Sequence, residues 1–140
     1  MLEDAPHRHI VFAIPKRIRL FFKFDRRLLS ILFSAARETL KSVFTQDGGT
    51  IGAILTAQTA GESLNFHPHL HGIMANGLWC ENDVFSPFTE IDLKALNSRF
   101  AKRVLAALCK KGLVDETQVL QILTQEHTGF SVWLRPEPSA

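Results

Sequence analysis

A chain of 140 residues, 46% of them hydrophobic, has the size and composition of one globular domain with one core. No apolar run approaches the roughly 20 residues that a membrane-spanning helix needs, and the N-terminus lacks the basic region and apolar stretch of a secretory signal. The two cysteines, Cys80 and Cys109, have no metal-type spacing, which argues against a disulfide framework and fits a reducing cytoplasm.

The formal net charge is only +2, but the basic residues are concentrated in two stretches. Residues 7–41 contain nine Lys and Arg against two acidic residues, Asp25 and Glu38. Residues 93–112 contain six Lys and Arg and no acidic residue. Charge segregated in this way predicts a polyanionic partner, and the plain alternative for either stretch is a solvated helix face.

The first half of the chain predicts alternating strands and helices. Residues 8–15 are rich in β-branched and aromatic side chains and predict a strand, and residues 17–24 predict a short basic helix. Asp25 is a candidate N-cap for a long helix that ends near Phe44. A turn at 46–49 then leads to a strand over 50–60, which Gly61 breaks, and the next strand covers 67–76 and ends in a turn near Asn76 and Gly77. These two strands are close enough in sequence to form a hairpin.

The second half predicts two helices and a final strand. Residues 78–88 are irregular with room for a short strand, and residues 89–112 form a helix with Gly112 as its C-cap. A shorter helix over 115–125 begins at an acidic cap, and residues 129–136 form the last strand. This order of elements predicts an α+β fold with a largely antiparallel sheet.

The stretch NFHPHLHGIM, residues 65–74, places three histidines at alternate positions. On a strand, His67, His69 and His71 share one face at spacings of about 7 Å, while Leu70 points into the core. We expect Ile73 to point the same way as Leu70 if the strand continues past Gly72. Two imidazoles of such a row can converge on one metal ion, so two ligands are expected from the motif and the rest from elsewhere. The alternative is three partly exposed histidines with no ligand role.

Two known kinds of His-x-His metal protein fit poorly. A cupin motif begins with Gly, five residues and then His-x-His, which Gly61, His67 and His69 match, but it then needs a Glu where Ile73 and Met74 stand. A cupin is also nearly all strand. An amidohydrolase barrel needs on the order of 250 residues.

The sequence resembles a third kind, the HUH single-strand nucleases, which are named for a His-hydrophobic-His motif that His69-Leu70-His71 matches. Within that superfamily it resembles the rolling-circle insertion-sequence transposases of the IS-ninety-one-like group. Five blocks carry the resemblance in the family's order, from about His7 to Arg135: RHIVFAIPKRIRLFF, LLSILFSAARETL, LNFHPHLHGIMANG, FAKRVLAALCKKGLV and GFSVWLRP.

The resemblance implies an antiparallel sheet flanked by helices, with the histidines on a central strand, in a bacterial protein associated with the nucleoid. It implies that His69 and His71 hold a divalent metal, Mg²⁺ or Mn²⁺, which polarises the scissile phosphate of single-stranded DNA at transposon ends. His67 is a candidate assisting ligand, and Gln58, on the preceding strand, is another from its position. In the family, a tyrosine hydroxyl then attacks phosphorus and leaves a free 3′-OH.

The chain departs from the family at this step, because it contains no tyrosine. The family's nucleophilic tyrosines lie downstream of the matched region, and a cysteine-rich zinc-binding segment lies upstream. We therefore expect a transposase HUH core that lacks both segments, a truncated copy that is inactive alone.

Further residues are expected to serve DNA binding or packing. Phosphate contacts are expected from the basic residues Lys16, Arg17, Arg19, Lys23, Arg26, Arg27, Lys102 and Arg103. For Phe21, Phe22, Phe24, Trp79 and Trp133, core packing is expected over base stacking. His7 and His9 are expected to be structural. Two alternatives remain open: a non-catalytic module that binds single-stranded DNA or zinc, and a small cupin-like metal enzyme.

Overall fold

A computed structural model describes residues 6–44, 48–59 and 66–135. The strands are β1 (His7–Ala13), β2 (Thr50–Gln58), β3 (His69–Trp79), β4 (Phe85–Pro87) and β5 (Ser131–Leu134). The helices are α1 (Lys16–Phe24), α2 (Leu29–Phe44), α3 (Leu93–Lys110) and α4 (Glu116–Leu123), with short 3₁₀ helices at Arg26–Leu28 and Glu81–Asp83. No helix within these ranges is long and apolar enough to cross a membrane.

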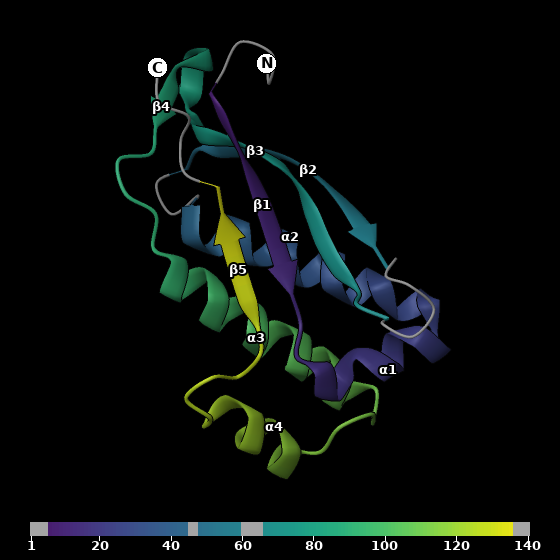
Figure 1. Cartoon of the computed structure of the whole chain (residues 1–140). Coiled ribbons are helices and arrows are strands. Elements are labelled where there is room, and N and C mark those ends of the chain that lie inside the picture. The colour runs from purple at the N-terminus through teal and green to yellow at the C-terminus, as the bar shows by residue number, and fades with distance from the viewer. Residues whose placement is uncertain (1–5, 45–47, 60–65, 136–140) are drawn as a thin grey trace.

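The strands form one antiparallel sheet in the order β2-β3-β1-β5, and β4 pairs with the far end of β3. Helices α2 and α3 lie together against one face of this sheet (Figure 1). Side chains on the opposite face, which we call the open face, remain partly exposed: they include Thr56, His69, His71, His9, Val11 and Trp133. The predicted α+β class and antiparallel sheet are therefore confirmed.

The core lies between the sheet and α2 and α3. Phe12 of β1 and Leu70 of β3 point toward the helices and are fully buried, and the Phe12 ring lies 4.8 Å from the ring of Phe100 on α3. Full burial of a side chain of this kind stabilises the fold by about 1.5–3 kcal/mol. The period of two along the strands therefore decides which face is apolar.

Helix ends follow the predicted capping residues. The Asp25 side chain accepts a hydrogen bond from the backbone N–H of Arg27, at the start of the 3₁₀ turn that leads into α2. Asp115 forms a capping box with Gln118 at the start of α4. Gly112 follows α3 with φ of +76°, a conformation that favours glycine.

Three details of the histidine strand differ from prediction. Strand β3 continues to Trp79 instead of turning at Asn76, because Gly77 lets β4 approach: a Cβ there would lie 2.4 Å from the backbone oxygen of Ser86. Ile73 is 38% exposed and lies on the open face, because alternation puts it with the histidines. His67 precedes the strand.

The predicted break at Gly61 lies outside the described residues, as does part of the predicted turn at 46–49.

Candidate metal and nucleic-acid site

Strand β3 brings two of the three histidines onto the open face. His69 and His71 lie on this face with ring centroids 5.9 Å apart, and His67, just before the strand, lies 5.5 Å from His69. All three are partly buried. The row predicted from sequence is therefore present, with its first member outside the regular strand.

The His69 ring is oriented by a backbone hydrogen bond. Its Nδ1 lies 2.9 Å from the carbonyl oxygen of His67. A carbonyl only accepts, so Nδ1 donates, and the lone pair of the neutral ring is on Nε2. In metal sites, a histidine that binds the ion through one ring nitrogen commonly donates a hydrogen bond from the other nitrogen to a backbone carbonyl.

His9 of β1 joins this group, although the sequence led us to expect a structural role for it. Its Nε2 lies 3.5 Å from Nδ1 of His71, and the two ring centroids are 5.7 Å apart. The pairing of β1 with β3 produces this contact across 62 residues of sequence. The alternation of His7 and His9 along a predicted strand is the only local signal that could have suggested it.

Strand β2 adds polar side chains beside the histidines. Gln58 is paired in register with His69, and Thr56 with His71. Gln58 is exposed, and the Thr56 hydroxyl donates to the backbone oxygen of His71 at 3.2 Å. Gln58 lies on the strand that precedes the histidines, as expected, and its ligand role stays a prediction.

His67 differs from the other histidines in its surroundings. Its Nδ1 is buried, with no hydrogen-bond partner among the described residues. Burial lowers the pKa of His67 below its usual value, and the positive charge of Arg19 lowers it further. Both effects favour a neutral ring, which is the form that binds metals.

The histidines meet only part of the requirement for a metal site. Within the described ranges, no three His, Cys, Asp or Glu side chains are placed to hold an ion together. The 3.5 Å between His9 and His71 is nevertheless close to the separation of two nitrogens on one ion, about 3.0–3.4 Å for bonds of about 2.0–2.1 Å. This pair fits an ion that completes its shell with water and phosphate oxygens.

Gly72 sets the spacing of the strands next to His71. A Cβ at this position would lie 1.8 Å from the backbone oxygen of Ile54 on β2. Because real Cβ atoms do not approach so closely, any larger residue would push β2 away from β3.

Basic side chains of α1 and the turn after it surround the His67 end of the site. Arg19 donates to the backbone oxygen of Ile14 at 3.2 Å, and Arg26 donates to the Thr59 hydroxyl, just after β2, at 2.7 Å. Lys16, Arg17 and Lys23 are exposed on α1. The structure therefore brings Arg19 and Arg26 of the first basic stretch to the end of the sheet that carries His69.

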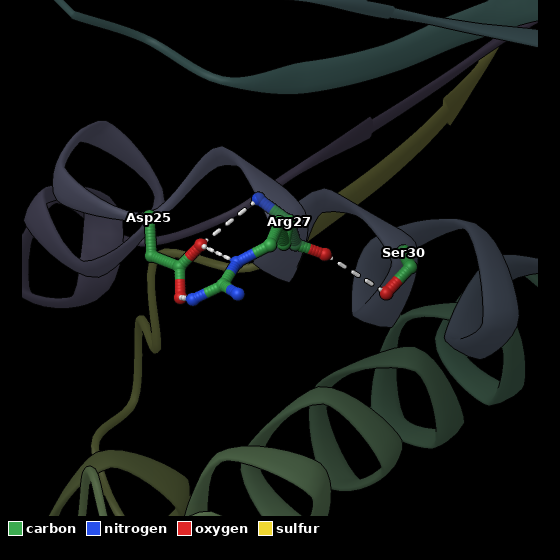
Figure 2. A network of polar contacts seen from close by, with 3 residues as sticks. All are labelled: Asp25, Arg27 and Ser30. Atoms are coloured by element: carbon green, nitrogen blue, oxygen red, sulfur yellow. Dashed lines mark hydrogen bonds and ion pairs between the residues drawn. The ribbon is translucent and has the colours of Figure 1, made fainter.

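Arg27 is engaged by Asp25 and is less available than its neighbours. Its guanidinium donates to both carboxylate oxygens of Asp25, at 3.0 and 3.2 Å, and its backbone oxygen accepts from Ser30 (Figure 2). The hydrogen bond from Arg27 holds the pKa of Asp25 below its usual range. This carboxylate would compete with a phosphate for Arg27.

The second basic stretch lies apart from the histidines. Lys102 and Arg103 are exposed on α3, which packs against the covered face of the sheet. The structure does not bring them together with the histidines of the open face.

Two aromatic residues expected in the core are exposed: Phe24 is 82% exposed and Trp133 is 46% exposed. The others are buried or partly buried: Phe22 lies in the core, and Trp79 packs on Phe85. Both exceptions stand at the edge of the packed region, Phe24 in the last turn of its helix and Trp133 on an edge strand.

Histidines on the open face of an antiparallel sheet, next to basic side chains, form a site suited to a phosphate-bearing polymer. The sequence is similar to bacterial transposases, one of them from an insertion sequence element, which supports a transposase-related function. No protein-family model matches the chain.

Two curated relatives carry this similarity. The transposase for insertion sequence element IS801 of Pseudomonas savastanoi pv. phaseolicola is 33% identical over 84 residues, covering 56% of this chain and 20% of that protein. The putative transposase y4qJ of Sinorhizobium fredii is 31% identical over 80 residues, covering 54% of this chain and again 20% of the relative. The match therefore spans about one fifth of the length of these relatives.

Proposed function

We propose that this chain is the histidine-bearing core of an HUH-type insertion-element transposase, which binds single-stranded DNA and a divalent cation for strand nicking and transfer. The observation that carries the proposal is the meeting of His9, His69 and His71 on one open face beside Arg19 and Arg26. The named relatives are transposases, which fits this assignment.

We propose His9 and His71, whose ring nitrogens lie 3.5 Å apart, as the pair that holds the ion, with His69 reaching it through Nε2 only after its side chain rotates. Gln58 is the proposed oxygen donor, and the His67 carbonyl orients the His69 ring. Nitrogen donors suit Mn²⁺ better than Mg²⁺, which prefers an all-oxygen shell. When bound, the ion would supply Lewis-acid polarisation of a phosphate. The chain's own residues hold the ion and the strand.

Cleavage by this polypeptide alone is not expected, because the chain contains no tyrosine. In this proposal the attacking hydroxyl comes from a segment outside the 140 residues, and the isolated chain binds DNA without cutting it. The same fact favours a second candidate function, a non-catalytic module that binds single-stranded DNA or zinc through the same histidines. A cupin-like enzyme is disfavoured, because the described residues form an open sheet flanked by helices and not a cupin barrel.

The metal proposal is tested by titrating Mn²⁺ into the parent chain and three variants, with calorimetry as the readout. His71→Ala and His9→Ala should each weaken Mn²⁺ binding at least tenfold, because each removes a ligand. His127→Ala is the matched control and should bind like the parent, since His127 is exposed after α4. Equal affinity in all four proteins would exclude a histidine metal site, and binding of Zn²⁺ alone would favour the non-catalytic module.

The DNA proposal is tested by the salt dependence of binding to a fluorescent oligothymidylate. Loss of one phosphate contact in Arg26→Gln should weaken binding and reduce the slope of log affinity against log salt by about 0.7. Lys102→Gln removes the same charge from the helix layer, and its salt slope should equal that of the parent chain. A parent chain without salt-dependent binding would contradict both DNA-binding functions.

A further inference from the structure

Trp133 occupies an unusual place for a tryptophan. It lies on β5, the edge strand of the sheet, paired in register with Val11 of β1, and it faces away from the core. Nearly half of its surface is exposed, at 46%. A large aromatic surface is therefore in contact with solvent and available to a partner.

The tryptophan ring is held next to the histidines. Its centroid lies 6.3 Å from that of His9, with the ring planes at 81°. The backbone around it is fixed by a hydrogen bond from the Arg135 N–H to the His9 oxygen and by one from Nε of Arg8 to the Arg135 oxygen. Trp133, His9, His71 and His69 thus form a continuous row across three strands.

The charge of this face suits a polyanion. Strands β1, β2, β3 and β5 contain no Asp or Glu. A cationic side chain, Arg19, lies near His67 at one end of the row. A strand of nucleic acid can therefore cross the row without meeting a carboxylate on these strands.

We propose that Trp133 stacks on a base of the single-stranded DNA that crosses this face, next to the phosphate held at His9 and His71. The assignment rests on the proposed function, since it takes DNA as the bound polymer. Single-stranded DNA presents free base faces to an aromatic ring, whereas a duplex keeps its bases stacked on one another. Trp133 thereby selects unpaired DNA and fixes which nucleotide lies at the histidines.

The first measurement is fluorescence quenching in the Trp79→Phe chain, where Trp133 is the one remaining tryptophan. Trp79 packs on Phe85 near β4, and Phe at this position keeps an aromatic contact. An oligothymidylate of about 16 nucleotides, long enough for a typical single-strand site, should quench the emission of Trp133. An abasic deoxyribose-phosphate oligomer of equal length should bind without quenching it. This measurement leaves Trp133 intact, so it does not depend on how a Trp133 variant folds.

The second measurement compares the affinities of variants for the same two probes. Trp133→Val keeps a strand-forming residue and should weaken oligothymidylate binding about tenfold, while Trp133→Phe keeps a ring and should retain most of it. Both variants should bind the abasic oligomer like the parent, with an unchanged salt slope. Leu120→Ala is the control, since it removes another exposed apolar side chain, at 62% exposure, from α4.

The outcomes separate this proposal from the one on which it rests. Two results would overturn the stacking role and leave DNA binding intact. One is salt-dependent binding of both probes without quenching of Trp133. The other is an equal loss of affinity for both probes in Trp133→Val. Failure of the parent to bind either probe would overturn both proposals.

Discussion

The two faces of the sheet differ in what holds their side chains in place. On the covered face, Phe12 and Leu70 are fully buried against helices, and their identity is dictated by packing. On the open face, the alternate positions of the same strands carry His9 and His71, whose ring nitrogens contact one another at 3.5 Å. The difference teaches that packing requires no histidine at these positions. A row of histidines there calls for a functional explanation.

The largest expected effect on stability comes from substituting neighbouring residues of β1 that point to opposite faces of the sheet. Phe12→Ala should lower the free energy of unfolding by about 3–5 kcal/mol, because it opens a cavity against Phe100. The neighbouring Val11→Ala should cost about 1 kcal/mol or less, since Val11 lies on the open face. Urea unfolding followed by circular dichroism measures both. Equal losses at the two positions would mean that the open face is packed as well.

A smaller effect is expected where the histidine strand meets its neighbour. Gly72→Ala should cost about 2–3 kcal/mol, because the added Cβ meets the backbone of Ile54, which cannot move aside as a side chain can. It should also weaken Mn²⁺ binding by displacing His71. Thr56→Ala, which removes only a hydroxyl from the same strand pair, should cost about 1 kcal/mol or less. A Gly72→Ala chain as stable as the parent would show that the strands are not closely packed there.

The smallest effect concerns the exposed pair of Asp25 and Arg27 beside the basic helix. Because Arg27 lowers the pKa of Asp25 from its usual 3.8, the folded state binds this proton less readily than the unfolded one. The resulting stability is present above pH 3.8 and is lost as the pH falls through the lower pKa of the folded state. Asp25→Asn keeps a capping side chain without the charge, so its melting temperature should be slightly low at pH 7. It should equal that of the parent near pH 2. If the melting temperatures of the two chains differed by the same amount at every pH in this range, the loss would come from weaker capping and not from the lost charge.

Local patterns in the sequence predicted most of the fold. The alternation of strands, the helical spacing of apolar residues and the caps at Asp25, Asp115 and Gly112 are all local, and the structure bears them out. The predicted end of β3 was wrong, because Gly77 was interpreted as part of a turn. In the structure, Gly77 instead allows a neighbouring strand to approach closely.

The site could be predicted only in part, because half of it depends on pairing between distant strands. His69 and His71 stand in one motif and share a face for the reason expected. His9 reaches them through the β1–β3 register, and Trp133 joins through the β1–β5 register, neither of which a local pattern encodes. The exposure of Trp133 follows from its place at a sheet edge, which depends on the strand order.

The strand order also has a consequence for how the chain folds during synthesis. Of the described strands, β1 is made before the others, and both of its neighbours come later, β3 in the middle of the chain and β5 close to the end of the described residues. Until those segments leave the ribosome, β1 has two bare edges and an apolar side formed by Ile10 and Phe12. A fold with such distant contacts forms slowly and is open to aggregation meanwhile. Substitutions in β5 that delay its docking would therefore lower the yield of folded protein in the cell more than they lower the stability of the finished domain.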